Sequence, residues 1–141
     1  MLLGQANPQD KRVFARTGNF IRQLRNTGPG DLMNKLIDTT NLESVLHEFA
    51  RQRDWEPFHT ARNLILALTG EVGELAEIFQ WMTDGQAAEI MQTAQAEHVK
   101  QEVADVLLYL MRLAMVLKID VDEAVRNKIA LNAVKYPALK A

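Results

Sequence analysis

The sequence predicts an all-α fold, and three observations support that prediction. Apolar residues recur every three to four positions, which is the spacing of a helix with one buried face. No stretch alternates apolar and polar residues with the period of two that a half-buried strand shows. Residues that start and stop helices separate the apolar stretches. Because 48% of the 141 residues are hydrophobic, the chain can form the core of one domain.

Residues 1–40 are expected to be an N-terminal extension outside the main domain. The Thr-Gly-Pro-Gly sequence at residues 27–30 would end any helix that precedes it. Asp31 is a candidate cap for a further turn or two. The short helix expected before the break would be lined by Val13, Phe14, Phe20, Ile21 and Leu24.

The main domain is expected to span residues 41–137. Thr40 with Glu43, and Asp120 with Glu123, have the spacing of capping boxes that open helices. Pro137 would stop the last helix. The expected order is helix 40–54, loop 55–58, helix 60–82, a break at 84–85, helix 86–96, helix 98–117 and helix 120–133.

Charge and composition exclude several classes of protein. The formal net charge of −2 argues against a general nucleic-acid binder. The absence of cysteine excludes disulfides, thiolate zinc sites and cysteine nucleophiles. No apolar run approaches the roughly 20 residues of a membrane span, and the first residues lack the apolar core of a signal peptide. We therefore expect a cytoplasmic protein that binds neither nucleic acid nor membrane.

Acidic residues are concentrated in the middle of the chain. Glu71 and Glu74 share one face of the first long helix because they are three residues apart. Glu102 and Asp105 repeat that spacing on the second long helix. If the two helices pack side by side, the four carboxylates converge. Oxygen ligands of this kind favour hard cations, Mg²⁺ first and Mn²⁺ second.

The acidic pairs have two competing interpretations. Each pair could belong to a solvated acidic face, although both lie among large apolar residues. Gly70 and Gly73 interrupt the first long helix at a cost of roughly 0.5–1 kcal/mol each relative to Ala, and they leave room for a close helix or ligand. A di-iron carboxylate site would need an E-x-x-H motif on each of two helices, and the sequence has no such pair.

Three polar residues of the last helix are candidates for contacts with a nucleotide. Lys128, Asn132 and Lys135 have an i, i+4, i+7 spacing that places them on one helix face. Lysines there could neutralise triphosphate charge that a metal leaves over. The competing interpretation is ordinary surface charge near a helix C-terminus, where lysine is favoured.

Flat apolar side chains are candidates for stacking on a nucleobase, and each of them could equally be a core residue. Aromatic residues make up only 6% of the chain, so those near the acidic pairs are singled out. His59 is either a residue of a helix N-terminus or a ligand contact. The aromatic candidates are Trp55, Phe58, Trp81 and Tyr109.

Several segments taken together carry a resemblance to a known family. The first three are residues 71–77 (EVGELAE), 102–105 (EVAD) and 128–137, which end on K-Y-P. They resemble the MazG-like all-α nucleoside triphosphate pyrophosphatases. The resemblance is closer to the dCTP pyrophosphatase branch and covers about residues 42–137. Further matches to that branch are residues 53–56 (RDWE), 58–59 (FH), 62–63 (RN) and 79–81 (FQW).

The resemblance implies a four-helix core that assembles into dimers, and commonly into tetramers built from two dimers. It also implies a set of site residues. These are Glu71, Glu74, Glu102 and Asp105 for Mg²⁺, Lys128 and Lys135 for phosphates, and Trp55, Trp81, Tyr109 and Asn132 for base and sugar, with Phe58, His59 and Asn63 as further substrate-binding candidates.

The expected activity is hydrolysis of a deoxynucleoside triphosphate, dCTP or a related nucleotide first, to a monophosphate and pyrophosphate. Mg²⁺ held by the carboxylates would orient the phosphates, and Glu74 or Glu77 could activate the attacking water. The role would be nucleotide-pool cleaning. One alternative is a non-catalytic helical module that binds a nucleotide or a partner on the same scaffold. Another is a phosphoribosyl-ATP pyrophosphatase, a related all-α enzyme.

Overall fold

A computed structural model describes residue 22 and residues 35–137 of the chain. These residues form helices and no strand, which confirms the all-α prediction. The helix expected around residues 13–24 and the break at residues 27–30 lie outside the described residues, residue 22 apart. No helix of the described part is long and apolar enough to cross a membrane.

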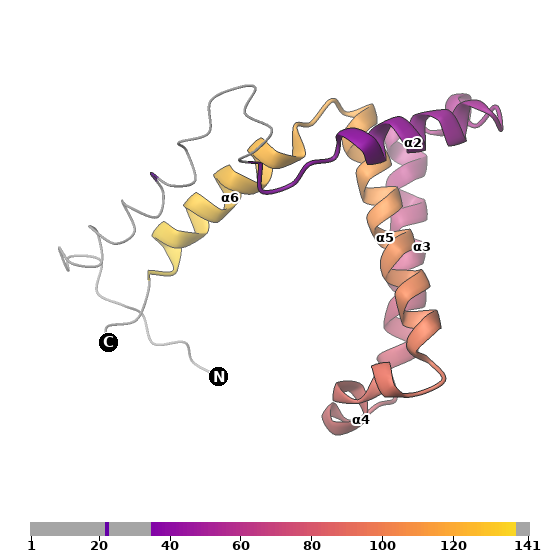
Figure 1. Cartoon of the computed structure of the whole chain (residues 1–141), viewed down its shortest axis with the longest axis vertical. Helices are drawn as coiled ribbons and strands as arrows, with labels where there is room; N and C mark the ends of the chain where they lie inside the picture. The colour runs from indigo at the N-terminus through magenta and orange to yellow at the C-terminus, as the bar shows by residue number, and fades with distance from the viewer. Residues whose placement is uncertain (1–21, 23–34, 138–141) are drawn as a thin grey trace. The chain divides into compact units, whose positions relative to one another are not determined.

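The described residues contain five α-helices and two short 3-10 helices (Figure 1). The elements are α2 (Thr40–Arg51), η2 (Glu56–Phe58), α3 (Ala61–Phe79), α4 (Asp84–Ala88), η3 (Ile90–Gln92), α5 (Ala96–Val116) and α6 (Val121–Lys135). Four of the expected helices of the main domain are present with shifted ends, whereas the helix expected at residues 86–96 is replaced by the short helix α4 and a 3-10 turn.

The chain divides into two compact units. Thr40–Ile119 forms one unit, which contains α2, α3, α4 and α5. Asp120 and the residues after it group with the residues before Thr40, so α6 belongs to the other unit. The single domain expected at residues 41–137 stays a prediction.

The core of the first unit forms where α3 and α5 pack side by side, with α2 against α5 (Figure 1). Leu64 of α3 is only 2% exposed, and Met111 and Ala114 of α5 are also buried. Ala50 contributes the small buried residue of α2. Among the described residues α3 buries only Leu64 and α5 buries a few apolar side chains, so the two helices enclose a narrow core and leave much of their apolar spacing exposed.

Side-chain caps fix where the helices begin. Thr60 accepts a hydrogen bond from the Asn63 backbone N–H at the start of α3. Asp120 accepts one from the Glu123 backbone N–H, 2.9 Å away, which confirms the predicted start of the last helix. These caps satisfy backbone N–H groups that have no partner inside the helix.

Two local predictions were wrong. Residues 55–58 are not an open loop, because Glu56–Phe58 forms a 3-10 turn with a proline in its first positions. Asp84-Gly85 does not end the first long helix but begins α4. The reason is a capping box that Thr83 forms with Gln86, so the cap stands two residues before the glycine, and α3 has already ended at Phe79.

Hydrogen bonds to one carboxylate connect the segments of the second unit at the start of α6. The Asp122 carboxylate accepts backbone N–H groups of Leu36 at 2.7 Å and Ile37 at 2.9 Å. It also accepts the Arg126 Nε–H one turn along the helix, at 2.6 Å. Burial alone would raise the pKa of Asp122, but these hydrogen bonds hold it below its usual value.

Candidate metal centre and adjoining cavity

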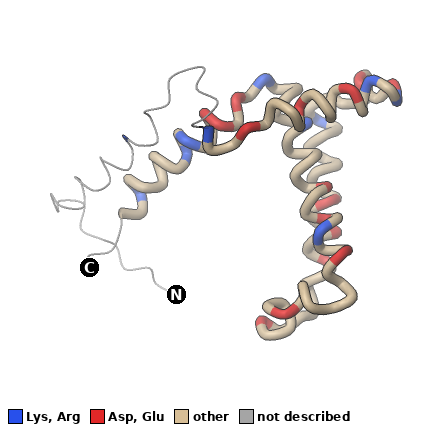
Figure 2. The backbone as a smooth tube through the Cα atoms, in the orientation of Figure 1, with Lys and Arg blue, Asp and Glu red and all other residues tan. Residues whose placement is uncertain are grey.

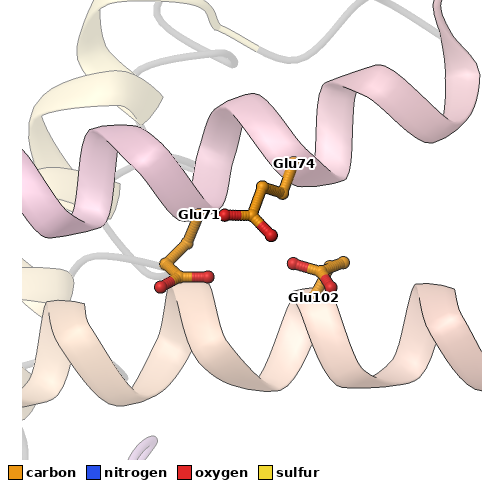
Figure 3. A group of neighbouring side chains, drawn as sticks. All are labelled: Glu71, Glu74 and Glu102. Carbon is orange, nitrogen blue, oxygen red and sulfur yellow. The ribbon is translucent and has the colours of Figure 1, made fainter.

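Three carboxylates meet where α3 and α5 lie side by side. Glu71 and Glu74 project from α3 toward Glu102 of α5 (Figure 3), and one oxygen of each lies within 4.8 Å of the others. Acidic residues lie on both helices in this region (Figure 2). The helical spacing and the side-by-side packing thus bring together three of the four predicted metal ligands.

Glu102 is the buried member of this group. It is 7% exposed, and its Oε2 atom is buried without a hydrogen bond from any described residue. Its other oxygen, Oε1, lies 3.2 Å from His98 Nε2 one turn earlier on α5. A buried carboxylate oxygen without a partner is unfavourable. The three carboxylates together offer an oxygen-only donor set, so the residues present fit a hard cation.

Electrostatics connect Asp105 to the same group. Burial raises the pKa of the Glu71 carboxyl, and the negative charges of Glu74, Asp105 and Glu102 raise it further. Asp105 is half-buried one turn after Glu102 on α5. Glu77 lies one turn after Glu74, is exposed, and does not belong to the group of three. A bound cation would relieve the repulsion within the group.

A cavity of about 280 Å³ opens beside Asp105, between α2, the residues around η2, and α5. Four of its lining residues were candidate site residues. Five were not, and they come from α2 and the second half of α5. The predicted lining residues are Trp55, His59, Asp105 and Tyr109, and the others are Leu46, Phe49, Ala50, Leu108 and Arg112.

Aromatic rings form part of the lining of this cavity. The ring centroids of Trp55 and Phe49 are 5.8 Å apart in an edge-to-face arrangement. The Trp55 and His59 rings are tilted, with centroids 6.0 Å apart. Outside the cavity lining, the Arg53 guanidinium lies 3.5 Å from the centroid of the Phe49 ring. Phe49 was missed by sequence reasoning because its contact with Trp55 depends on the turn at residues 52–55.

The cavity also contains a buried arginine. Arg112 is 8% exposed, and its Nε–H donates a hydrogen bond to His59 Nδ1 at 2.9 Å, across 53 positions of sequence. Burial lowers the pKa of His59, and the Arg112 charge lowers it further, while Glu56 acts in the opposite direction. Asp105, Tyr109 and Arg112 follow an i, i+4, i+7 spacing on α5. That spacing was the available signal for Arg112.

The structure does not bring every candidate to the cavity. Phe58 and Trp81 are 67% and 88% exposed, and neither lines it. The Asn63 side chain instead donates to the Phe58 carbonyl oxygen at 2.9 Å, which secures the end of η2. The ligand roles of these three residues stay predictions.

The three candidates of the last helix belong to the other unit. Lys128, Asn132 and Lys135 all lie on α6 and are exposed. The Lys135 ammonium lies 5.2 Å from the centre of the Tyr136 ring. Their nucleotide contacts stay predictions.

The glycines of α3 have open space around them. A Cβ atom added at Gly70 or at Gly73 would meet no described atom within 4 Å outside their own stretch of helix. No helix among the described residues approaches them closely, so the close helix or ligand that the sequence suggested stays a prediction.

Comparison with known proteins identifies the family. The profile of the MazG-like family matches residues 67–141, more than half of the chain. The chain belongs to the MazG-like family. The match includes all four predicted metal ligands, the cavity residues of α5 and the whole of α6.

Two kinds of relative agree with this membership. The chain is 49% identical over 92 residues to human dCTP pyrophosphatase 1 and 47% identical over 91 residues to the rat protein of that name. Each match covers 64% of this chain and 54% of the relative, so the chain spans about half the length of those proteins. A solved structure of a pyrophosphatase from Archaeoglobus fulgidus matches with a TM-score of 0.65 and 40% identity, over 70% of this chain and 91% of that one.

Proposed function

We propose that this MazG-like chain is a Mg²⁺-dependent pyrophosphatase that hydrolyses a deoxynucleoside triphosphate, dCTP or a related nucleotide first, to a monophosphate and pyrophosphate. The observation that carries the proposal is the buried, unpartnered Oε2 atom of Glu102 within the cluster of three carboxylates. The cavity that begins at Asp105 extends away from that cluster along α5. The similarity to dCTP pyrophosphatase 1 supports the choice of substrate.

The carboxylates would hold the metal. Glu71, Glu74 and Glu102 would bind it directly, and Asp105 would complete the set from the edge of the cavity. When bound, Mg²⁺ offsets the negative charge of the phosphates and orients them for in-line attack. Mn²⁺ fits the same oxygen-only set.

The other residues would bind the nucleotide and handle the proton. Trp55 and Tyr109 line the cavity and offer flat faces for stacking on the base, which is worth roughly 1–3 kcal/mol per base. Glu77, outside the group of three, is the candidate that accepts a proton from the attacking water. Phosphate contacts from Lys128 and Lys135, and a sugar contact from Asn132, complete the proposal.

The active form would be a homo-oligomer, a dimer or a tetramer. Val103, Leu107 and Leu110 share one face of α5 at an i, i+4, i+7 spacing, yet each is about half exposed. Ile65 and Leu66 of α3 are exposed to a similar degree. Exposed apolar faces of this kind mark protein–protein contacts. A second copy of the chain would cover them and give the highly exposed Trp81 a neighbour.

The test is a panel of canonical and modified triphosphates incubated with the purified chain and Mg²⁺, with pyrophosphate separated from orthophosphate. The proposal expects pyrophosphate and monophosphate, with dCTP among the best substrates. The activity would serve to clean the nucleotide pool. Nucleotide binding without turnover would instead favour a non-catalytic helical module, and release of orthophosphate with a diphosphate would contradict the reaction.

A further inference from the structure

Arg112 is a buried cation without a carboxylate partner among the residues that the structure describes. It is 8% exposed and makes no ion pair with any described residue. Its one hydrogen bond among the described residues joins Nε to His59 Nδ1, so its two terminal nitrogens have no described partner. A buried charge of this kind is unfavourable unless something pairs with it. Since folding does not explain the charge, a ligand with hydrogen-bond acceptors is the alternative.

The same hydrogen bond determines what His59 offers to a ligand. Nδ1 accepts from Arg112, so the neutral ring carries its hydrogen on Nε2 and is a donor there. The low pKa of His59, caused by burial and by the Arg112 charge, keeps the ring neutral. His59 Nε2 makes no hydrogen bond with a described residue. Arg112 and His59 together therefore present donors only.

The position of this pair fits the far edge of a nucleobase. Arg112 lies two helical turns, about 10 Å, beyond Asp105 on the same face of α5. Tyr109 lies between them on α5. Trp55, which directly precedes η2, also lines the cavity. Consider a nucleotide whose phosphates lie at the carboxylates and whose base stacks on these rings. The polar edge of that base would lie at Arg112 and His59.

We propose that Arg112 and His59 form a donor-only edge that selects cytosine over uracil. The O2 and N3 atoms of cytosine are two adjacent acceptors, which match two donors. Uracil carries a hydrogen on N3, so its N3–H donor would face the N–H donors of Arg112 and His59. The inference rests on the proposed function only in taking the cavity as the base site. It adds a residue pair for base selection.

The experiment measures binding without turnover. Titration calorimetry of the full chain with Mg²⁺ compares dCMP, dUMP and the monophosphate of 2-pyrimidinone deoxyriboside, which keeps O2 and N3 but lacks the amino group. We expect dCMP and the pyrimidinone nucleotide to bind more tightly than dUMP by about tenfold, the lower part of the range for reading a base by paired hydrogen bonds. Equal binding of dCMP and dUMP would overturn the proposal.

Two variants test the pair itself. Arg112→Met keeps a long side chain and removes the donors, and His59→Phe keeps a flat ring without a donor. Each should bring the ratio of dCMP to dUMP affinity close to one. Arg53→Met is the matched control, because it removes a positive charge near Phe49 but outside the cavity lining, and it should leave the ratio unchanged. An unchanged ratio in both cavity variants would contradict the inference.

The outcome is separable from that of the proposed function. A chain that hydrolyses no triphosphate but keeps the dCMP preference would contradict the pyrophosphatase and support the base edge. A chain that hydrolyses dCTP and dUTP equally, and binds both monophosphates equally, would support the pyrophosphatase and contradict the base edge. Circular dichroism of each variant establishes that it is folded, and His59→Phe alone decides the matter if Arg112→Met does not fold.

Discussion

The carboxylate cluster lies within two neighbouring helices, whereas the cavity beside it joins segments that are far apart in the chain. The cluster is built from pairs three residues apart on two helices, so helical geometry alone predicts which side chains share a face. The cavity joins α2, the residues around η2 and α5, and its hydrogen bond between Arg112 and His59 spans 53 positions. Chemistry that depends on local spacing can be read from a single sequence, whereas chemistry that depends on distant contacts needs the fold.

The largest expected effect is on the cluster. Glu102→Gln removes the charge of the buried ligand while keeping its size, so we expect activity and Mn²⁺ affinity to fall by more than about a hundredfold. Without metal the same variant should unfold at a higher temperature, because a buried charge is gone. Steady-state kinetics, Mn²⁺ binding by electron paramagnetic resonance and thermal unfolding check the three effects.

Glu97→Gln is the matched control for that change. Glu97 lies on the same helix, pairs with Lys100 at 3.2 Å on the exposed surface, and is not part of the cluster. It should leave metal affinity and activity within about twofold, since exposed ion pairs contribute little. A Glu102→Gln variant that behaves like this control would remove Glu102 from the metal site.

The second effect compares two tryptophans. Trp55 lines the cavity, whereas Trp81 is 88% exposed and lies outside it. Trp55→Ala should raise KM for dCTP by roughly fivefold to a hundredfold, which is the loss of one stacking contact. Trp81→Ala should raise KM for dCTP by a smaller factor. A larger effect of Trp81→Ala would mean that a second copy of the chain brings Trp81 to the substrate.

The third effect is a dependence on pH. Because the pKa of Glu71 is raised in the folded chain, this group favours folding below the unfolded value of 4.5, and that contribution is lost as the pH rises through the folded value. Mg²⁺ prefers the ionised carboxylate, so it should stabilise the chain more as the pH rises. Thermal unfolding with EDTA and with excess Mg²⁺, from pH 4 upward, measures both trends. A stabilisation by Mg²⁺ that is independent of pH would contradict the assignment.

The smallest effect concerns the glycines of α3. Gly73→Ala should stabilise the chain by roughly 0.5–1 kcal/mol, because alanine favours a helix and nothing described lies within 4 Å of the new Cβ. Gly70→Ala should behave alike. Chemical denaturation measures the change. A loss of activity in a stabilised variant would show that a ligand or a second chain approaches α3 closely.

The helix type and the convergence of three acidic side chains were predictable, but several helix ends and five of the nine cavity residues were not. The start of α6 was predicted because Asp120 and Glu123 act within one turn. The start of α4 was missed because Asp84-Gly85 looks like a stop until the Thr83 cap is known. Arg112 was missed because its spacing from Asp105 on α5 does not by itself distinguish it from a surface arginine, and its burial follows from packing between α2 and α5.

The central claim is a metal-dependent attack on the α phosphorus by water, and one measurement tests it most directly. The full chain is incubated with dCTP and Mg²⁺ in water enriched in ¹⁸O, and the products are analysed by mass spectrometry. The account predicts dCMP that carries one ¹⁸O atom, unlabelled pyrophosphate, and no reaction when EDTA replaces Mg²⁺. Label in pyrophosphate or orthophosphate instead of dCMP, or equal turnover with EDTA, would contradict it.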